Sequence, residues 1–138
     1  MKVVKFLLYY LLVTNGMAGI WALFFPHEFY TSFPGSGFHW IDIMGPYSEH
    51  LTRDVGAFFC AVASLSLFTV LKIDRSSVRM TAYANIVFGI PHVIYHTYMI
   101  DMFPTPKDKF FGILALVLGV VAGGVMLLFI KRVPANAA

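Results

Sequence analysis

Four long apolar runs, separated by polar stretches, set the pattern of this chain. They cover residues 6–25, 51–71, 80–100 and 110–130, and the second reaches that length by starting near Leu51. About 20 residues in a helix cross a hydrocarbon layer of about 30 Å, so each run approaches the length of a membrane span. Backbone groups in lipid must bond within their own segment, which favours helices. The pattern predicts an all-α integral membrane four-helix bundle that forms one transmembrane domain over residues 1–138.

The longest connection, residues 26–50, carries a helical signal of its own. Turn-forming residues at 34–37 are followed by a short apolar stretch at 38–44, which contains Trp40. Tryptophan is enriched where a membrane meets water. We therefore expect a short interfacial helix at residues 38–44 in the first outer loop, with Trp40 in the aromatic belt.

The first run also has features of a secretory signal. Lys2 and Lys5 precede it, and Gly16 and Ala18 stand at the spacing of a cleavage site. Its apolar stretch continues to Phe25, however, which is longer than the apolar core of a signal peptide. We therefore expect this run to be retained as the first span.

Composition agrees with a membrane protein. Of the 138 residues, 59% are hydrophobic and 12% are charged, whereas soluble domains carry about 25% charged residues. The single cysteine, Cys60, excludes a disulfide within the chain. The net charge of +3 does not indicate nucleic-acid binding, because no basic patch is interleaved with stacking aromatic residues. The lipid bilayer is the partner that this composition indicates.

Lysine and arginine predict the orientation, because short cytoplasmic loops carry an excess of both. Seven of the ten basic residues lie at the two chain ends or between the second and third runs: Lys2, Lys5, Lys72, Arg75, Arg79, Lys131 and Arg132. Arg53, Lys107 and Lys109 lie on the other side. Both termini and the 72–79 connection are therefore expected to be cytoplasmic.

Small residues and one proline predict how the helices pack. Helices in lipid associate closely over small side chains, which singles out Gly119 and Gly123 in the fourth run and Ala57 and Ala61 in the second. These could join helices of one chain or of neighbouring subunits. Pro91, inside the third run, removes a backbone hydrogen bond and predicts a helix kink.

Ionisable residues gather where the second run begins. Glu49 and Arg53 are four residues apart, so a helix places them on one face where they can pair. His50 and Asp54 have the same spacing on an adjacent face.

The third run carries a matching pair of histidines. His92 and His96 share a helix face, with Tyr95 beside them. Because the second and third runs are consecutive and antiparallel, Asp54 and His96 are expected at similar depth. Polar groups within the hydrocarbon normally face the bundle interior and find partners. We therefore expect a polar outer-leaflet site formed by His50, Asp54, His92 and His96, supported by Glu49, Arg53 and Tyr95.

Such a cluster is compatible with several roles. The residues could satisfy one another and fix the helix register, bind a divalent metal through neutral imidazoles, or hold a haem or a quinone headgroup. Proton or small-molecule handling is a further role. The chain contains no GxSxG, phosphate-binding glycine loop or GxGxxG motif, so catalysis by this chain alone is not expected.

Two segments carry a family resemblance. SEHLTRDVGAFF, which opens the second run, and PHVIYH in the third resemble a set of small four-span bacterial membrane proteins and, more distantly, the DoxX-like group. The resemblance implies a four-helix bundle in a bacterial cytoplasmic membrane. For some DoxX-like proteins it also implies a place as a small subunit of a membrane oxidoreductase.

The function expected from these features is that of a small multi-pass, non-catalytic accessory or assembly subunit. Its partners would be other membrane subunits or further copies of itself. The alternative is a DoxX-like oxidoreductase subunit that binds metal, haem or quinone at the His/Asp site.

Overall fold

The computed structural model describes residues 1–35 and 37–135, and within these ranges the chain is all-helical, without strands. The α-helices are α1 (Lys2–Phe24), α2 (Pro26–Ser32), α3 (Glu49–Leu71), α4 (Arg75–Tyr98) and α5 (Pro106–Leu128). Single 3-10 turns follow or connect them: η1 (Asp42–Met44), η2 (Ile100–Met102) and η3 (Ile130–Arg132).

Three of these helices, α1, α3 and α5, are long and apolar enough to cross a membrane. The remaining long helix, α4, has 24 residues, but polar residues within it, among them Asn85, His92 and His96, make it less hydrophobic. Three helices therefore support a bilayer environment. Whether α4 also crosses the membrane depends on whether its polar side chains contact protein or lipid.

Capping residues determine where the helices begin. Ser48 accepts a hydrogen bond from the Leu51 amide at the start of α3. Asp74 and Ser77 form a reciprocal capping box at the start of α4. Thr105 caps α5, whose first residue is a proline. These side chains satisfy amide groups that the first helical turn leaves without partners.

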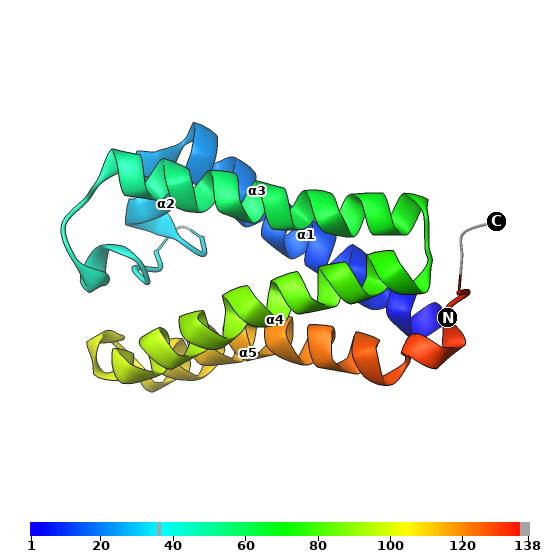
Figure 1. The fold of residues 1–138 in the computed structure, drawn as a ribbon. Helices are drawn as coiled ribbons and strands as arrows, with labels where there is room; N and C mark the ends of the chain where they lie inside the picture. The colour runs from blue at the N-terminus through cyan, green and yellow to red at the C-terminus, as the bar shows by residue number, and fades with distance from the viewer. Residues whose placement is uncertain (36, 136–138) are drawn as a thin grey trace.

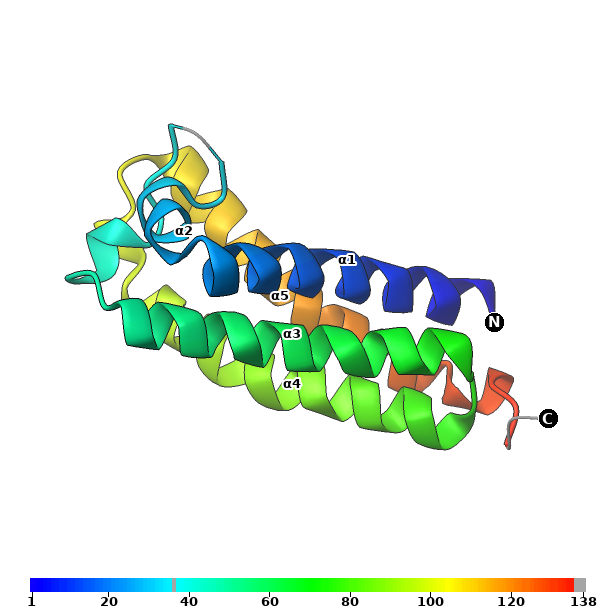
Figure 2. The ribbon, with the colours of Figure 1, turned by 90° about the horizontal axis from the view of Figure 1, so that it is seen from above.

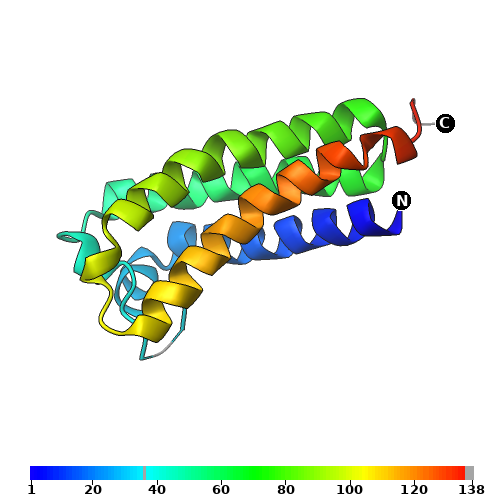
Figure 3. The ribbon, with the colours of Figure 1, turned by 90° about the horizontal axis from the view of Figure 1, so that it is seen from below.

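The long helices form two pairs, α1 with α3 and α4 with α5 (Figure 1). In Figure 2, α1 and α3 run beside each other over most of their length. The pairs meet at the end that holds the N-terminus, the α3–α4 turn and the end of α5, which we call the closed end. They diverge toward α2 and η2, which we call the open end (Figure 1). Figure 3 shows from below that α5 crosses the other helices obliquely. The buried core lies at the closed end: Val4, Leu8, Leu11, Val78, Ala82, Ala122, Met126 and Val133.

Two glycines bring α1 and α3 into backbone contact. A Cβ atom on Gly56 would lie 2.5 Å from the Leu23 nitrogen, and one on Gly19 would lie 2.8 Å from the Cys60 nitrogen. In the other pair, a Cβ on Gly123 would lie 2.7 Å from Ile86 Cγ1. Each pair is therefore held at a separation that only glycine permits.

The other small residues expected at helix contacts do not pack within this chain. A Cβ on Gly119 would meet no atom within 4 Å, and Ala57 and Ala61 are exposed on α3. For the alanines, the reason is the rotation of α3, which turns Gly56 toward α1 and Ala57 away from it. Spacing alone does not reveal that rotation.

The expected interfacial helix is not found over residues 38–44. The loop instead contains α2, which begins at Pro26 directly after α1, and only the 42–44 part of the expected segment is helical. Trp40 lies in the loop, where its amide donates a hydrogen bond to the Phe33 carbonyl. Its side chain is buried rather than placed in an exposed aromatic belt.

Candidate functional site: a cavity at the open end

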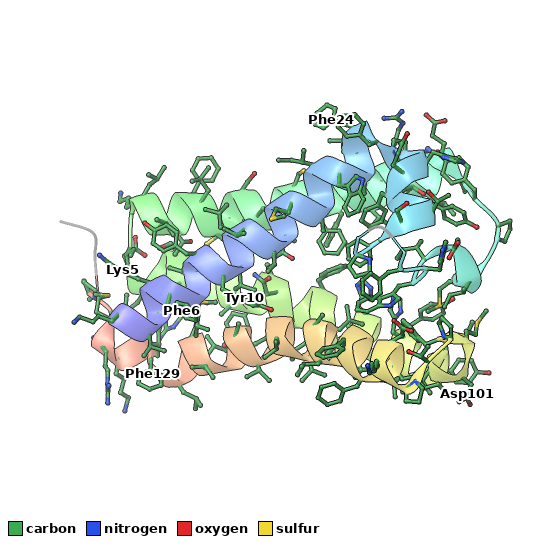
Figure 4. All side chains as sticks on the ribbon, turned by 180° about the vertical axis from the view of Figure 1, so that it is seen from behind. Lys5, Phe6, Tyr10, Phe24, Asp101 and Phe129 are labelled. Carbon is green, nitrogen blue, oxygen red and sulfur yellow. The ribbon has the colours of Figure 1, made fainter. Side chains whose placement is uncertain are left out.

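A cavity of about 970 Å³ lies between the two helix pairs. Its lining comes from all five α-helices and from the loop after α2, and most of it is aromatic or aliphatic. Figure 4 shows the surrounding frame from behind: Lys5 and Phe129 lie at the closed end, whereas Phe24 and Asp101 lie on opposite arms of the open end. Ligand sites in proteins have this size and this mixture of apolar walls with few polar groups.

An asparagine pair bridges the two helix pairs within the cavity wall. Asn15 of α1 donates through Nδ2 to Asn85 Oδ1 of α4 at 3.1 Å. Asn85 Nδ2 in turn donates to the Thr81 carbonyl at 2.8 Å. Asn85 is only 5% exposed, so these bonds compensate for the removal of its amide from water.

His92 and His96 supply two further polar side chains of the wall. Their rings are stacked, with centroids 4.7 Å apart and planes inclined by 25°. Phe88 contacts His92 edge to face at 5.0 Å, and Tyr95 contacts His96 in the same manner at 5.6 Å. The Nδ1 atom of His96 is buried and has no hydrogen-bond partner. The expectation that these two histidines share a helix face is met, and one of them retains a free polar atom.

Pro91 precedes this pair inside α4, and the helix continues past it to Tyr98. Proline cannot donate to the carbonyl of Val87 four residues earlier. One backbone hydrogen bond of α4 is therefore missing directly before His92.

The loop between α2 and α3 covers the end of the cavity. Trp40 donates through Nε1 to Asp108 Oδ1 at 3.0 Å, and Thr105 donates to Asp108 Oδ2 at 2.6 Å. The Trp40 ring also contacts Phe103 edge to face, at 6.0 Å between centroids. These contacts fasten the loop to the start of α5 and so bridge the two helix pairs at the open end.

A salt bridge holds η2 to α5 nearby. Lys109 Nζ lies 2.9 Å from Asp101 Oδ1. Hydrogen bonding to this ammonium group, together with its charge, lowers the pKa of Asp101. This ion pair therefore holds the connection after α4 to the first turn of α5.

His50 and Asp54 pair with each other, away from the cavity. His50 Nε2 lies 3.2 Å from Asp54 Oδ2, with side chains 84% and 61% exposed. Neither residue is among those that line the cavity. The expected union of this pair with His92 and His96 is therefore not found.

Arg53 and Glu49 also pair, and Arg53 has a second contact. Its Nε donates to Glu49 Oε1 at 2.8 Å. Its Nη1 donates to the carbonyl of Leu23 in the last turn of α1. Carbonyls in that turn lack helical partners, so Arg53 caps α1 from α3 and joins the two helices at the open end.

The geometry does not favour a metal or a haem. Over residues 1–35 and 37–135, no three His, Cys, Asp or Glu side chains are grouped so as to hold a metal ion. Bis-histidine haem ligation requires imidazoles on opposite faces of the porphyrin, whereas His92 and His96 are stacked on one helix. The arrangement is better suited to hydrogen bonding with an uncharged group.

A groove runs along the other side of the histidine pair, between α3 and α4. Its further lining is apolar and includes Phe58, Ala61, Leu65 and Val87. The residues that line both the groove and the cavity are Phe88, His92, Tyr95 and His96. The histidines thus belong to a thin wall between an internal space and the outer surface of the bundle.

Sequence reasoning did not identify Asn15, Trp21 or Asp108 as site residues. Both tryptophans of the chain line the cavity. A signal for Asp108 was present, because an acidic residue three positions after a capping threonine, with a proline between them, marks a helix start. No sequence signal pairs that carboxylate with Trp40, 68 residues away.

Comparison with known proteins adds no assignment. No protein-family model matches this chain, and no match was found among curated proteins or solved structures.

Proposed function

We propose that this protein is a small non-catalytic membrane subunit that binds an apolar molecule with an uncharged polar head in the open-end cavity. The observation that carries the proposal is the cavity of about 970 Å³, whose apolar walls include the stacked histidines. The buried His96 Nδ1 atom lacks a partner, and an unsatisfied buried polar atom is unfavourable. A ligand head that hydrogen-bonds there would remove this cost.

In this proposal α4 is the fourth span. Its polar residues Asn85, His92 and His96 contact the bundle interior or line the cavity, which is where polar groups of membrane helices are tolerated. The basic residues gather at the closed end, where the chain begins and where η3 lies. We therefore place that end in the cytoplasm and the cavity toward the outer leaflet of a bacterial cytoplasmic membrane.

A quinone headgroup belongs to the proposed ligand class, because its carbonyls accept hydrogen bonds and its flat ring suits aromatic walls. The alternative function, a DoxX-like subunit of a membrane oxidoreductase, would use the same cavity. His50 and Asp54 have no role in either version, because both are exposed and neither lines the cavity.

Both tryptophans line the cavity, so their fluorescence can report binding directly. We would titrate the purified protein with a tailless benzoquinone, which quenches tryptophan emission on contact. Gly119 lines the cavity and has open space at its Cβ position. Gly119→Phe is expected to weaken binding about tenfold, equivalent to about 1.4 kcal/mol.

Gly124→Phe is the matched control, because Gly124 is on the same helix with equally open space but does not line the cavity. It should bind the benzoquinone as the parent protein does. Quenching that does not saturate, or equal affinity in the two variants, would contradict a ligand site in this cavity.

The accessory role is tested separately, by purification in mild detergent. Other membrane proteins should co-purify in constant proportion if the chain is a subunit. A monodisperse homo-oligomer without partners would contradict the accessory role and leave the binding result to stand on its own.

A further inference from the structure

We propose that the ligand enters from the bilayer between α3 and α4, and that it is an amphiphile whose long apolar tail lies in the α3–α4 groove. This inference rests on the proposed function for the location of the head. It adds the tail, the route and the conclusion that the ligand is dissolved in the membrane rather than in water.

The cavity and the groove share a wall. Four residues, Phe88, His92, Tyr95 and His96, line both the cavity and the groove. A head that bonds to His96 in the cavity therefore lies within one side-chain layer of the bundle surface. A tail attached to that head can reach lipid through this wall.

The wall is also made of side chains rather than backbone. Ring contacts link Phe88 to Phe58 and Phe59 of α3, at 4.9 and 5.1 Å between centroids. Across the α1–α3 seam, in contrast, Gly56 places backbone against backbone. Side chains can change rotamer within nanoseconds, whereas separating the glycine contact would require moving whole helices. The α3–α4 side can open at lower cost.

The chemistry of the groove favours a hydrocarbon tail. Apart from the histidines and Tyr95, its lining consists of alanine, valine, leucine, phenylalanine and proline. Ala61 is exposed, and Val87 is 70% exposed, so both are in contact with lipid if α3 and α4 span the membrane. An alkyl or isoprenoid chain matches these walls, whereas a phosphate head would find no cation among them.

The cavity also reaches the flank between α1 and α5, which is the rival route. Met17, Ile20 and Ala115 line it there. These side chains offer no hydrogen-bonding group, while both histidines belong to the α3–α4 wall. A ligand anchored at the histidines is therefore closer to the α3–α4 groove.

Two probes with the same head test the tail assignment: the tailless benzoquinone and its decyl-substituted counterpart. Ala61→Trp fills the groove without altering a cavity residue. We expect this variant to bind the decyl probe about tenfold more weakly and to bind the tailless probe unchanged. Val87→Trp repeats the test from α4, in case Ala61→Trp fails to fold.

Ala57→Trp is the control, because Ala57 is an exposed alanine on α3 that lines neither space. It should leave both probes unaffected, which also corrects for partition of the decyl probe into detergent. Unchanged decyl binding in Ala61→Trp and Val87→Trp, or equal loss of both probes, would overturn the tail assignment. If the parent protein binds neither probe, the head site itself fails, and the proposed function fails with it.

Discussion

At the scale of single residues, the buried polar groups show how the two helix pairs are connected. Asn15 and Asn85 bond across the cavity wall at 3.1 Å, and Trp40 bonds to Asp108 at 3.0 Å. Both bonds join the α1–α3 pair, or the loop attached to it, to the α4–α5 pair. Where apolar packing between the pairs is sparse, paired polar groups therefore set their relative position.

The asparagine pair should show a measurable coupling energy. Interhelical hydrogen bonds in membrane proteins contribute about 0.6 kcal/mol on average and about 1.7 kcal/mol at most. A double-mutant cycle with Asn15→Ala and Asn85→Ala should give a coupling of about this size in reversible unfolding in mixed detergent micelles. Additive effects of the two substitutions would show that the bond does not connect the helices.

Arg53 should stabilise the contact between α1 and α3 through the Leu23 carbonyl. Arg53→Met removes both this bond and the pair with Glu49, and we expect a loss of about 1 kcal/mol in the free energy of unfolding. Glu49→Gln is the comparison, because it removes only the charge of the exposed partner and should cost less. An equal loss in the two variants would assign the effect to the ion pair instead.

At the scale of helices, the sequence predicted which segments are helical more reliably than how they are rotated. The run at 51–71 corresponds to α3, and the run at 80–100 corresponds to α4, which begins earlier at Arg75. Hydropathy marks only the apolar part of a helix, whereas the Asp74–Ser77 capping box marks its true start. Capping residues would therefore have corrected this boundary.

The rotation of each helix is what limited prediction of the site. Spacing placed His50 with Asp54, and His92 with His96, and both pairs form. Whether the two pairs meet depends on which side of α3 faces α4. A helix in lipid is apolar on its outer as well as its inner side, so hydrophobic periodicity does not distinguish them. The glycine at position 56, which faces α1, decides the rotation.

Gly56 should therefore tolerate no side chain. An alanine Cβ would lie 2.5 Å from the Leu23 nitrogen, so α1 and α3 must separate, and overpacking of this kind costs about 1–3 kcal/mol. Unfolding of Gly56→Ala in mixed micelles should show this loss. Gly119→Ala, where a Cβ meets no atom within 4 Å, should be neutral or slightly stabilising, and equal effects at the two positions would contradict the observed helix contact.

At the scale of the whole molecule, the two ends differ in how they are held together. The closed end has one buried apolar core, which includes Val4 near the start of the chain and Val133 near its end. The open end contains a cavity and depends on a loop fastened by Trp40 and Asp108. Regions with few buried apolar contacts open at lower free energy than the core, so ligand entry is expected at the open end while the closed end stays intact.

The arrangement of the ends also makes a definite prediction about membrane topology. If α4 spans the bilayer, Ser76 near its start and Lys107 at the start of α5 lie on opposite sides. In a Cys60→Ala background, which removes the single native cysteine, an impermeant maleimide should label Lys107→Cys in intact cells and Ser76→Cys only after lysis. Lys2→Cys should behave as Ser76→Cys does, because the N-terminus and the α3–α4 turn share the closed end.

Labelling of Ser76→Cys and Lys107→Cys from the same side would show that α4 does not cross. Labelling with the two sides exchanged would keep the four spans and place the cavity in the cytoplasmic leaflet instead.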